Sequence, residues 1–236
     1  METIAIRYCF KFEDDTQEIF NLELDANNLE IVGNAPAILP QWTNLDFHQC
    51  PHCPLNTNTH PNCPLCVNLA NVVRRFDSVL SYDQVQLDVI TEERCVSQQT
   101  TAQRGISSML GLVIATCGCP HTIYFKPMAR FHLPLSTEEE TIYRAASMYM
   151  LAQYFLEKKG KTVDIELKGL RQIYINIHLV NSTIVSRLRV ASKTDSSINS
   201  IIMLDMFAKA MPYVIEEHLD EIRYLFAPYL LSTDTG

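Results

Sequence analysis

The sequence predicts an α+β protein in which an N-terminal antiparallel sheet precedes a C-terminal bundle of helices. Apolar and polar residues alternate between residues 3 and 33, as in strands with one buried face. From residue 100 onward, apolar residues recur with the period of an α-helix instead. Between these regions, residues 48–69 gather four cysteines and three histidines. We therefore expect a sheet, a zinc knuckle segment and about four long helices.

The composition is that of an ordinary globular protein. The chain has 236 residues, 47% of them apolar and 19% charged, and a net charge of −8. Such a chain can bury a substantial core. The acidic balance lacks the basic footprint of duplex-binding proteins, so we expect no nucleic-acid partner.

Neither a secretory signal nor a membrane span is expected. The N-terminal stretch "METIAIRYCFKFEDD" has no basic region and no long apolar run. The apolar stretch "ISSMLGLVIATC" is too short to cross a bilayer. These features predict a cytoplasmic protein.

Residues 3–33 predict three strands of an antiparallel meander. The first strand places five apolar residues on one face, and the second places three there; they are Ile4, Ile6, Tyr8, Phe10, Phe12, Phe20, Leu22 and Leu24. The stretch "NLEIVG" adds a short third strand. Residues 34–47 predict an irregular connector, in which Trp42 caps the core beside the cysteine segment.

The next elements follow the cysteine segment. Residues 68–81 carry apolar residues at helical spacing, from Leu69 to Leu80. Residues 83–99 alternate again and predict one long strand that joins the sheet. A helix is then expected from Thr101 to about Thr116, with Gly105 among the small residues on one side. Glycine in a helix costs roughly 1 kcal/mol relative to alanine, so its presence here indicates tight packing.

Capping signals mark the clearest helix of the chain. Ser136 followed by Glu139 forms a capping box, and the first turn is rich in glutamate. Lys158, Lys159 and Gly160 end the helix, as the helix dipole and C-cap preference require.

Two further regions are helical. Residues 166–190 place Leu170, Ile173, Ile177, Val180 and Ile184 at spacings of three and four, which predicts a packing seam. Residues 196–231 predict two helices separated near Pro212. The seam is typical of a core, and a homodimer through the C-terminal helices is an equal alternative to a monomer.

The change of period near residue 100 is the one candidate boundary. Residues 1–99 would form the sheet with its metal segment, and residues 100–236 a helical lobe. No flexible linker separates them, so we expect two lobes that share one core, or a single domain.

The cysteine segment predicts a metal site. Cys50 and Cys53 form one Cys-x-x-Cys pair, and Cys63 and Cys66 form another after nine intervening residues. Two such turns can supply four thiolates to one Zn²⁺. The intervening residues "PLNTNTHPN" are almost free of apolar side chains, so a metal would supply their closure. Structural zinc contributes on the order of 10 kcal/mol to small modules.

Two details leave the ligand set open. Pro54 has no N–H to donate to a thiolate, so the first turn can be irregular. His60 or His52 could replace one cysteine, and iron is an alternative to zinc. A closed four-ligand site has no free coordination position, which favours a structural over a catalytic metal.

Redox chemistry is a rival interpretation of the same segment. "CPHC" resembles the active-site tetrapeptide of thiol–disulfide oxidoreductases of the thioredoxin superfamily, over these four residues only. In that family the pair opens a helix, whereas the polar residues after Cys53 do not continue as one. A related alternative is a thiol switch in which the segment loses its metal on oxidation.

Residues 117–132 gather a second set of reactive side chains on a loop broken by prolines. The set comprises Cys117, Cys119, His121, Lys126, Arg130 and His132. One interpretation is an enzyme pocket in which Arg130 and Lys126 bind an anion and His132 or His121 transfers protons.

The same loop has two other interpretations. Cys117 and Cys119 could hold a metal together with a histidine. The simplest interpretation makes both cysteines small buried apolar residues and pairs Arg130 with a glutamate among residues 138–140. No Ser–His–Asp order or phosphate-binding glycine loop is identified elsewhere.

Three stretches resemble a known family. "HQCPHCPL", "RFHLPLSTEEETIYRA" and "EIRYLFAPYL" are similar to a bacterial family of conserved hypothetical proteins classed as a domain of unknown function. The resemblance covers nearly the whole chain and implies a single evolutionary unit, but it implies no activity, cofactor or catalytic residue. The expected function is a zinc-stabilised module that binds a protein or a small ligand. An enzyme acting through residues 117–132 and a thiol redox protein are the alternatives.

Overall fold

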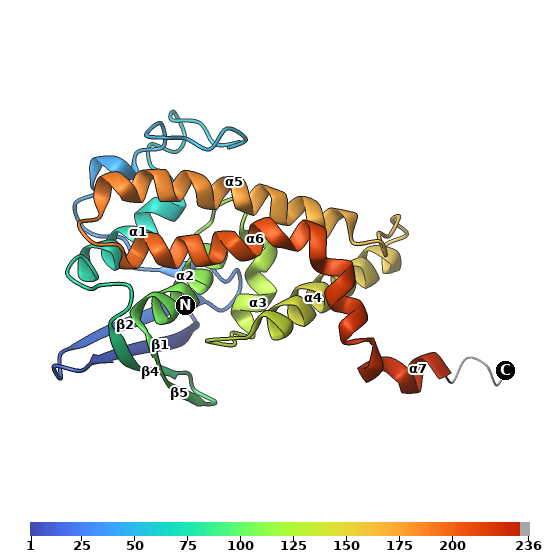
Figure 1. Cartoon of the computed structure of the whole chain (residues 1–236). Helices are drawn as coiled ribbons and strands as arrows, with labels where there is room; N and C mark the ends of the chain where they lie inside the picture. Colours follow the sequence, from blue (N-terminus) through green and yellow to red (C-terminus); the bar gives the residue numbers. More distant parts are fainter. Residues whose placement is uncertain (232–236) are drawn as a thin grey trace.

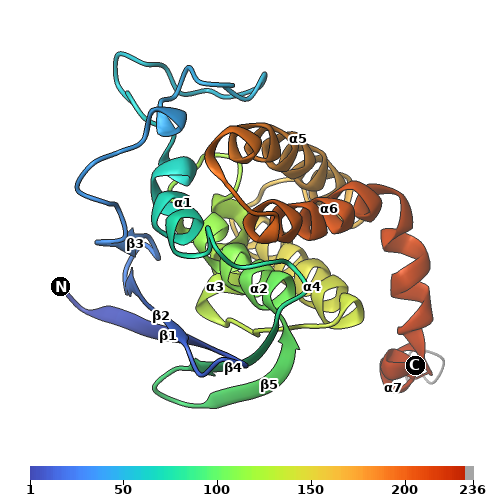
Figure 2. The ribbon, with the colours of Figure 1, turned by 60° about the vertical axis from the view of Figure 1, so that its left-hand side comes forward.

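The computed structural model describes residues 1–231 of the chain. Five antiparallel strands form one sheet in the order β3-β2-β1-β4-β5. Their bounds are Thr3–Phe12 (β1), Gln17–Asp25 (β2), Ile31–Val32 (β3), Gln84–Ile90 (β4) and Cys95–Thr101 (β5). The helices gather on one face of this sheet, as Figure 2 shows. The predicted α+β class is therefore confirmed.

The buried face of the sheet is the apolar one that the alternation predicts. Tyr8 lies opposite Phe20 on one side and Val89 on the other, and Phe10 lies opposite Leu87. All five side chains are buried. A two-residue period puts every second side chain on the core face, which fixes the register of the strands.

The single strand predicted over residues 83–99 is wrong. The chain forms a hairpin of β4 and β5, closed where the Thr91 N–H donates to the carbonyl oxygen of Arg94 at 2.9 Å. Both strands keep the same alternation, and the turn contains no glycine, proline or asparagine. The usual turn signals are therefore missing from the sequence.

The described residues form seven α-helices rather than about four. They are Pro64–Arg75 (α1), Ala102–Thr116 (α2), Lys126–Arg130 (α3), Glu138–Lys158 (α4), Lys168–Ala191 (α5), Ser196–Glu221 (α6) and Ala227–Leu231 (α7). Three 3₁₀ turns accompany them, at Gln41–Thr43 (η1), Ile123–Phe125 (η2) and Arg223–Phe226 (η3). Helices α2, α4, α5 and α6 are the long ones (Figure 1). Helix α3 lies in the stretch of residues 117–135, which the prolines predicted to be a loop.

Helix α2 lies between the sheet and helix α6. A Cβ atom at Gly105 would approach the Phe10 ring to 2.8 Å, so this glycine permits the close contact that the sequence predicts. Gly111, on the same helix, has no atom within 4 Å of such a Cβ. Only one of the two glycines therefore serves close packing.

The N-cap of α4 lies one residue later than predicted. The Thr137 hydroxyl accepts from the Glu140 N–H at 3.2 Å, and the Glu140 carboxylate accepts from the Thr137 N–H at 2.7 Å. Ser136 instead bonds to the Thr141 hydroxyl at 3.1 Å. Adjacent residue pairs both fit the capping-box pattern, so spacing alone did not choose between them.

Helix α6 continues through Pro212, where the sequence predicts a break. Ala208, Met211 and Ile215 on either side of the proline are buried, and this packing holds the two halves in one helix. Proline removes one backbone hydrogen bond and bends a helix rather than always ending it. The axis of α6 bends in its second half in Figure 1.

Two clusters of buried apolar residues form the core. The larger joins the sheet to α1, α2, α5 and α6, so it draws on both sides of residue 100. The smaller lies among α4, α5 and α6. Among the described residues, α6 is also long and apolar enough to cross a bilayer, although a core helix passes the same test.

Candidate thiol and metal site

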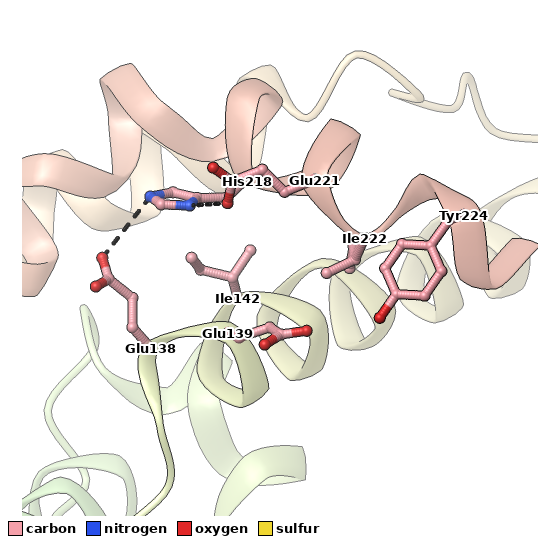
Figure 3. A pocket seen from close by; sticks show the side chains of 7 residues that line it. All are labelled: Glu138, Glu139, Ile142, His218, Glu221, Ile222 and Tyr224. Carbon is pink, nitrogen blue, oxygen red and sulfur yellow. Dashed lines mark hydrogen bonds and ion pairs between the residues drawn. The ribbon is translucent and has the colours of Figure 1, made fainter.

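Two open pockets of the described residues lie away from both predicted clusters. One, of about 440 Å³, lies between the start of α4 and the end of α6. There His218 lies 2.9 Å from Glu221 and 3.8 Å from Glu138 (Figure 3). The other, of about 690 Å³, borders the β1–β2 turn. Neither is lined by a cysteine, by Arg130 or by His132.

The fold brings the two reactive segments of the sequence together. The His121 ring nitrogen Nε2 lies 2.9 Å from the backbone oxygen of His52, and the two rings are 4.0 Å apart. Burial raises the pKa of the Cys119 thiol to about 11, and charge on Cys63 and Cys50 adds to this increase. Residues 117–121 therefore lie against the cysteine segment, a contact that the sequence did not predict.

The first cysteine pair lies in a turn. The Cys53 N–H donates to the carbonyl oxygen of Cys50 at 3.0 Å, which closes the turn without any N–H from Pro54. Residues 54–62 form no helix, as the polar sequence predicts. The "CPHC" tetrapeptide thus lacks the following helix that the thioredoxin superfamily places after its active-site pair.

The second cysteine pair opens a helix. Cys63 is the N-cap of α1, Pro64 is its first residue, and Cys66 lies in its first turn. Proline suits this position because the first N–H groups of a helix have no internal partner. The helix begins four residues before the predicted start at residue 68. Proline at the first helical position was the signal that could have found this start.

The N-terminus of α1 separates the pKa values of its two thiols. The Cys66 thiol donates to the Cys63 sulfur, and the N–H groups of Cys66 and Leu65 also contribute, so the pKa of Cys63 falls to about 6. Burial raises the pKa of Cys66 well above its ordinary value. Cys63 is therefore a thiolate at neutral pH, while Cys66 keeps its proton.

A buried arginine on α5 stands beside these thiols. Only 1% of Arg187 is exposed. Its guanidinium donates to four carbonyl oxygens of the connector, those of Trp42 (2.9 Å), Asn44 (2.7 Å), Leu45 (3.0 Å) and His48 (3.2 Å). Trp42 is buried in the core, as predicted.

Arg187 has a thiolate, rather than a carboxylate, as its neighbouring anion. Within residues 1–231, no carboxylate lies within ion-pair distance of its guanidinium. Burial raises the pKa values of Cys50 and Cys66, and the hydrogen bond from Cys66 lowers that of Cys63; the charge of Arg187 acts to lower all three to a smaller extent. A buried charge without a partner is costly, so an anion among the thiols offsets the cost of burying Arg187.

Sequence reasoning missed Arg187, although a signal for it exists. The residue lies three positions after Ile184 and so continues the apolar seam of α5. A charged residue on a buried seam is the kind of exception that marks a structural or functional group.

The predicted metal ligands approach one another without forming a closed set. Cys50, Cys63 and Cys66 are near enough for their charges to shift one another's pKa values. Among residues 1–231, however, no three Cys, His, Asp or Glu side chains are arranged to hold a metal ion. His60 lies on an exposed turn, bonded to Thr59 at 2.9 Å.

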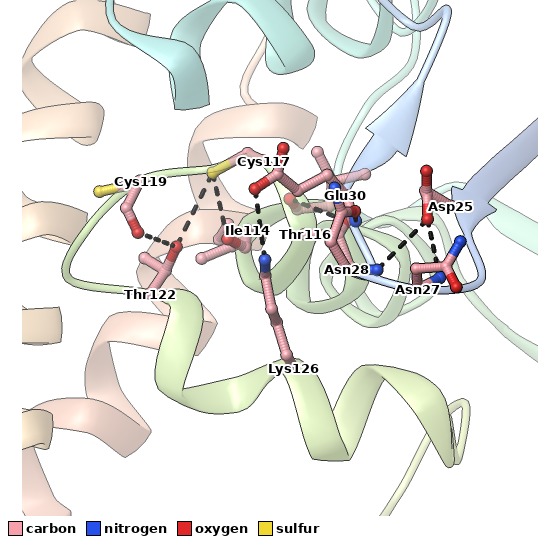
Figure 4. Close-up of polar contacts among 11 residues, drawn as sticks. Asp25, Asn27, Asn28, Glu30, Ile114, Thr116, Cys117, Cys119, Thr122 and Lys126 are labelled. Carbon is pink, nitrogen blue, oxygen red and sulfur yellow. Dashed lines mark hydrogen bonds and ion pairs between the residues drawn. The ribbon is translucent and has the colours of Figure 1, made fainter.

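The first cysteine and the lysine of the second segment are both held by contacts within the fold. The Cys117 thiol donates to the carbonyl oxygen of Ile114 at 3.2 Å and lies 3.7 Å from the Thr122 hydroxyl (Figure 4). Burial raises its pKa. Cys117 thus fits the simplest interpretation, a small buried residue. Lys126 is not aimed at an anion pocket but pairs with Glu30 at 3.4 Å.

Arg130 and His132 do not converge on one site. His132 lies 2.5 Å from the Tyr8 hydroxyl, and burial, with the charge of Arg144, lowers its pKa to about 4. Arg130 is exposed and lies over the Phe131 ring, 5.5 Å from its centre. Its predicted ion pair with residues 138–140 does not form within the described chain. The geometry therefore gives no support to an anion pocket at these two residues.

The fold and the site define an α+β protein with a cluster of thiols beside a buried cation. Residues 6–227 match the family described as "Domain of unknown function (DUF6901)", and the chain belongs to this family. The match spans nearly the whole chain and confirms the expected resemblance to a domain of unknown function. No curated protein and no solved structure matches the chain.

Proposed function

We propose that this protein is a zinc-stabilised binding module whose metal is held by Cys50, Cys53, Cys63 and Cys66. The observation that carries this proposal is the placement of the two pairs. One pair lies in a tight turn and the other in the first turn of a helix, and their charges influence one another. Short turns of these two kinds can bring two sulfur atoms toward one point, which is what a four-thiolate site requires.

The charges of the site also favour a bound cation. Four thiolates around Zn²⁺ leave a net charge of −2, and the adjacent Arg187 reduces this to −1. Cys63 is already ionised at neutral pH, whereas Cys66 would release its proton when the metal binds. At least one thiol must turn toward the others to complete the set.

The proposed metal would act by ordering a surface. A closed site supplies no chemistry of its own but would join the turn at residues 50–53 to the start of α1. The Cys63 N–H donates to the Thr43 carbonyl oxygen at 2.8 Å, which links this segment to the connector that Arg187 holds. The polar loop at residues 54–62 is then a fixed surface that a protein or small-ligand partner can recognise.

Metal analysis tests the proposal directly. We expect about one zinc per chain in the purified protein and loss of zinc in Cys53→Ser and Cys63→Ser. Cys95→Ser is the matched control, because Cys95 is exposed on β5, far along the chain from the site. His60→Ala and His52→Ala show whether a histidine replaces one thiolate.

A second readout guards against variants that fail to fold. Titration of the metal-free wild-type protein with Co²⁺ should give the absorption bands of tetrahedral thiolate coordination at one equivalent. Wild-type protein that takes up neither Zn²⁺ nor Co²⁺ would contradict the proposal. So would a Cys63→Ser protein that retains a full equivalent of zinc.

A second candidate function is thiol–disulfide exchange at Cys63 and Cys66. It is favoured by one observation: this pair opens a helix, with a thiolate at its first cysteine and a protonated thiol at its second. The Cys63 thiolate would attack an external disulfide and release one thiolate. Cys66 would then lose its proton, attack Cys63 and release the disulfide's remaining half as a second thiolate. The substrate gains two electrons, and the pair becomes a cystine.

Alkylation of metal-free protein tests this candidate. We expect the rate at which iodoacetamide modifies Cys63 to be half-maximal near pH 6, because only the thiolate reacts. The same thiol in urea should titrate near its ordinary value of about 8.5. Equal profiles in the folded and unfolded protein would rule out an activated Cys63.

A further inference from the structure

The C-terminal end of the described chain forms an apolar arm. It consists of η3 and α7, residues 223–231, and extends away from the helices and the sheet in both ribbon views (Figures 1 and 2). Tyr224 is 70% exposed, Leu225 53% and Leu231 71%. A run of large apolar side chains with this exposure is typical of a surface that contacts a partner.

Helix α4 presents a second exposed apolar surface. Tyr143, Met150, Leu151, Tyr154 and Phe155 recur with helical spacing, and each of them is at least 39% exposed. We call these five residues the α4 stripe. The opposite face of α4 already packs in the core through Ile142 and Ala145, so the stripe is a second apolar face of the same helix.

Charges at the ends of the two surfaces are opposite. Four acidic residues precede the arm, and three lysines follow the α4 stripe; they are Glu216, Glu217, Asp220, Glu221, Lys158, Lys159 and Lys161. Glu216 pairs with Arg171 and Glu221 with His218, so the contact proposed below uses Glu217 and Asp220. Within one chain, the base of the arm borders the acidic start of α4, where His218 lies between Glu221 and Glu138 in one pocket. The lysines that follow the α4 stripe stand at the other end of α4, away from this pocket.

We propose that the arm of one copy covers the α4 stripe of a second copy, and that the exchange is reciprocal. The acidic base of each arm would lie beside the lysines at the end of the partner's stripe. A reciprocal contact of this kind has two-fold symmetry and closes as a dimer. Apolar burial would supply its affinity, and the charges would set its orientation.

Sedimentation of full-length variants tests this arrangement by charge exchange. Wild-type protein should sediment as a dimer at micromolar concentration. Lys158→Glu with Lys159→Glu should raise the dimer dissociation constant about tenfold, since each pair is lost twice in a symmetric dimer. Adding Glu217→Lys and Asp220→Lys to that variant should restore the wild-type constant to within about threefold. All four residues are exposed, so the fold is expected to tolerate the changes.

A substitution within the apolar stripe, compared with a matched control outside it, completes the test. Phe155→Glu should weaken the dimer at least as much as the lysine changes, whereas Ile165→Glu, at an exposed residue outside the stripe, should not. A monomer at every concentration would overturn the proposal, as would a dimer indifferent to Phe155→Glu. The proposal would also be overturned if adding Glu217→Lys and Asp220→Lys to the double lysine variant weakened the dimer further. Binding of monomeric protein to anionic vesicles through the arm would assign the arm to a membrane surface instead.

Discussion

At the scale of single residues, His132 shows how burial decides protonation. Its ring bonds to the Tyr8 hydroxyl, and its pKa is lowered to about 4 from an ordinary value of 6.5. The folded state therefore binds a proton less readily than the unfolded state between these two values. Unfolding becomes easier as the pH falls through this window, because protonation favours the unfolded chain.

The resulting prediction concerns stability against pH. The free energy of unfolding should fall by up to about 3 kcal/mol between pH 6.5 and pH 4 through His132 alone, at 1.36 kcal/mol per pKa unit. His132→Asn keeps a polar side chain but removes the titration, so its urea-unfolding curves should change less over this range. Parallel pH dependences in the two proteins would show that His132 does not contribute.

Residue spacing predicted the thiol pairs but could not predict their neighbours. Two Cys-x-x-Cys pairs are visible in the sequence, and each lies in the kind of tight local structure that the spacing allows. The contact between His52 and His121 joins segments 69 residues apart, and no local pattern encodes it. For the same reason, Arg130 and His132, two residues apart in the sequence, point to different environments.

At the scale of elements, the two glycines of α2 offer a matched pair of substitutions. Gly105→Ala should destabilise the protein by about 1–3 kcal/mol, since its Cβ would approach Phe10 to 2.8 Å. Gly111→Ala should stabilise it by up to about 1 kcal/mol, because the site has room and alanine favours the helix. Thermal unfolding of both variants checks the prediction. Equal effects would mean that α2 does not pack on the sheet as described.

Helices and strands could be predicted where the spacing of apolar residues agrees with the face that is buried in the core. They could not be predicted where tertiary packing overrides a local signal such as a proline. The strands β1 and β2 and the helices α2, α4 and α5 follow the expected periods. Pro212 would end an isolated helix, but burial of Met211 and Ile215 carries α6 past it. The β4–β5 turn lacks turn residues, so its position depends on pairing across the sheet rather than on local preference.

At the scale of the whole molecule, the change of period at residue 100 does not divide the core. The larger cluster of buried residues contains Phe10 and Leu69 from one side and Met109 and Ile201 from the other. Sheet and helices thus share the larger of the two buried clusters. The C-terminal arm is the exception, because it adds no residue to either buried cluster.

The hold of Arg187 on the connector has a consequence for biosynthesis. The carbonyl oxygens of Trp42 and Asn44 accept hydrogen bonds from Arg187, which lies 145 and 143 residues later in the chain. Until α5 leaves the ribosome, this arginine cannot fix the connector that precedes the cysteine segment. We therefore expect the nascent thiols to stay accessible to oxidants during most of translation, and a reducing milieu to improve the yield of native protein.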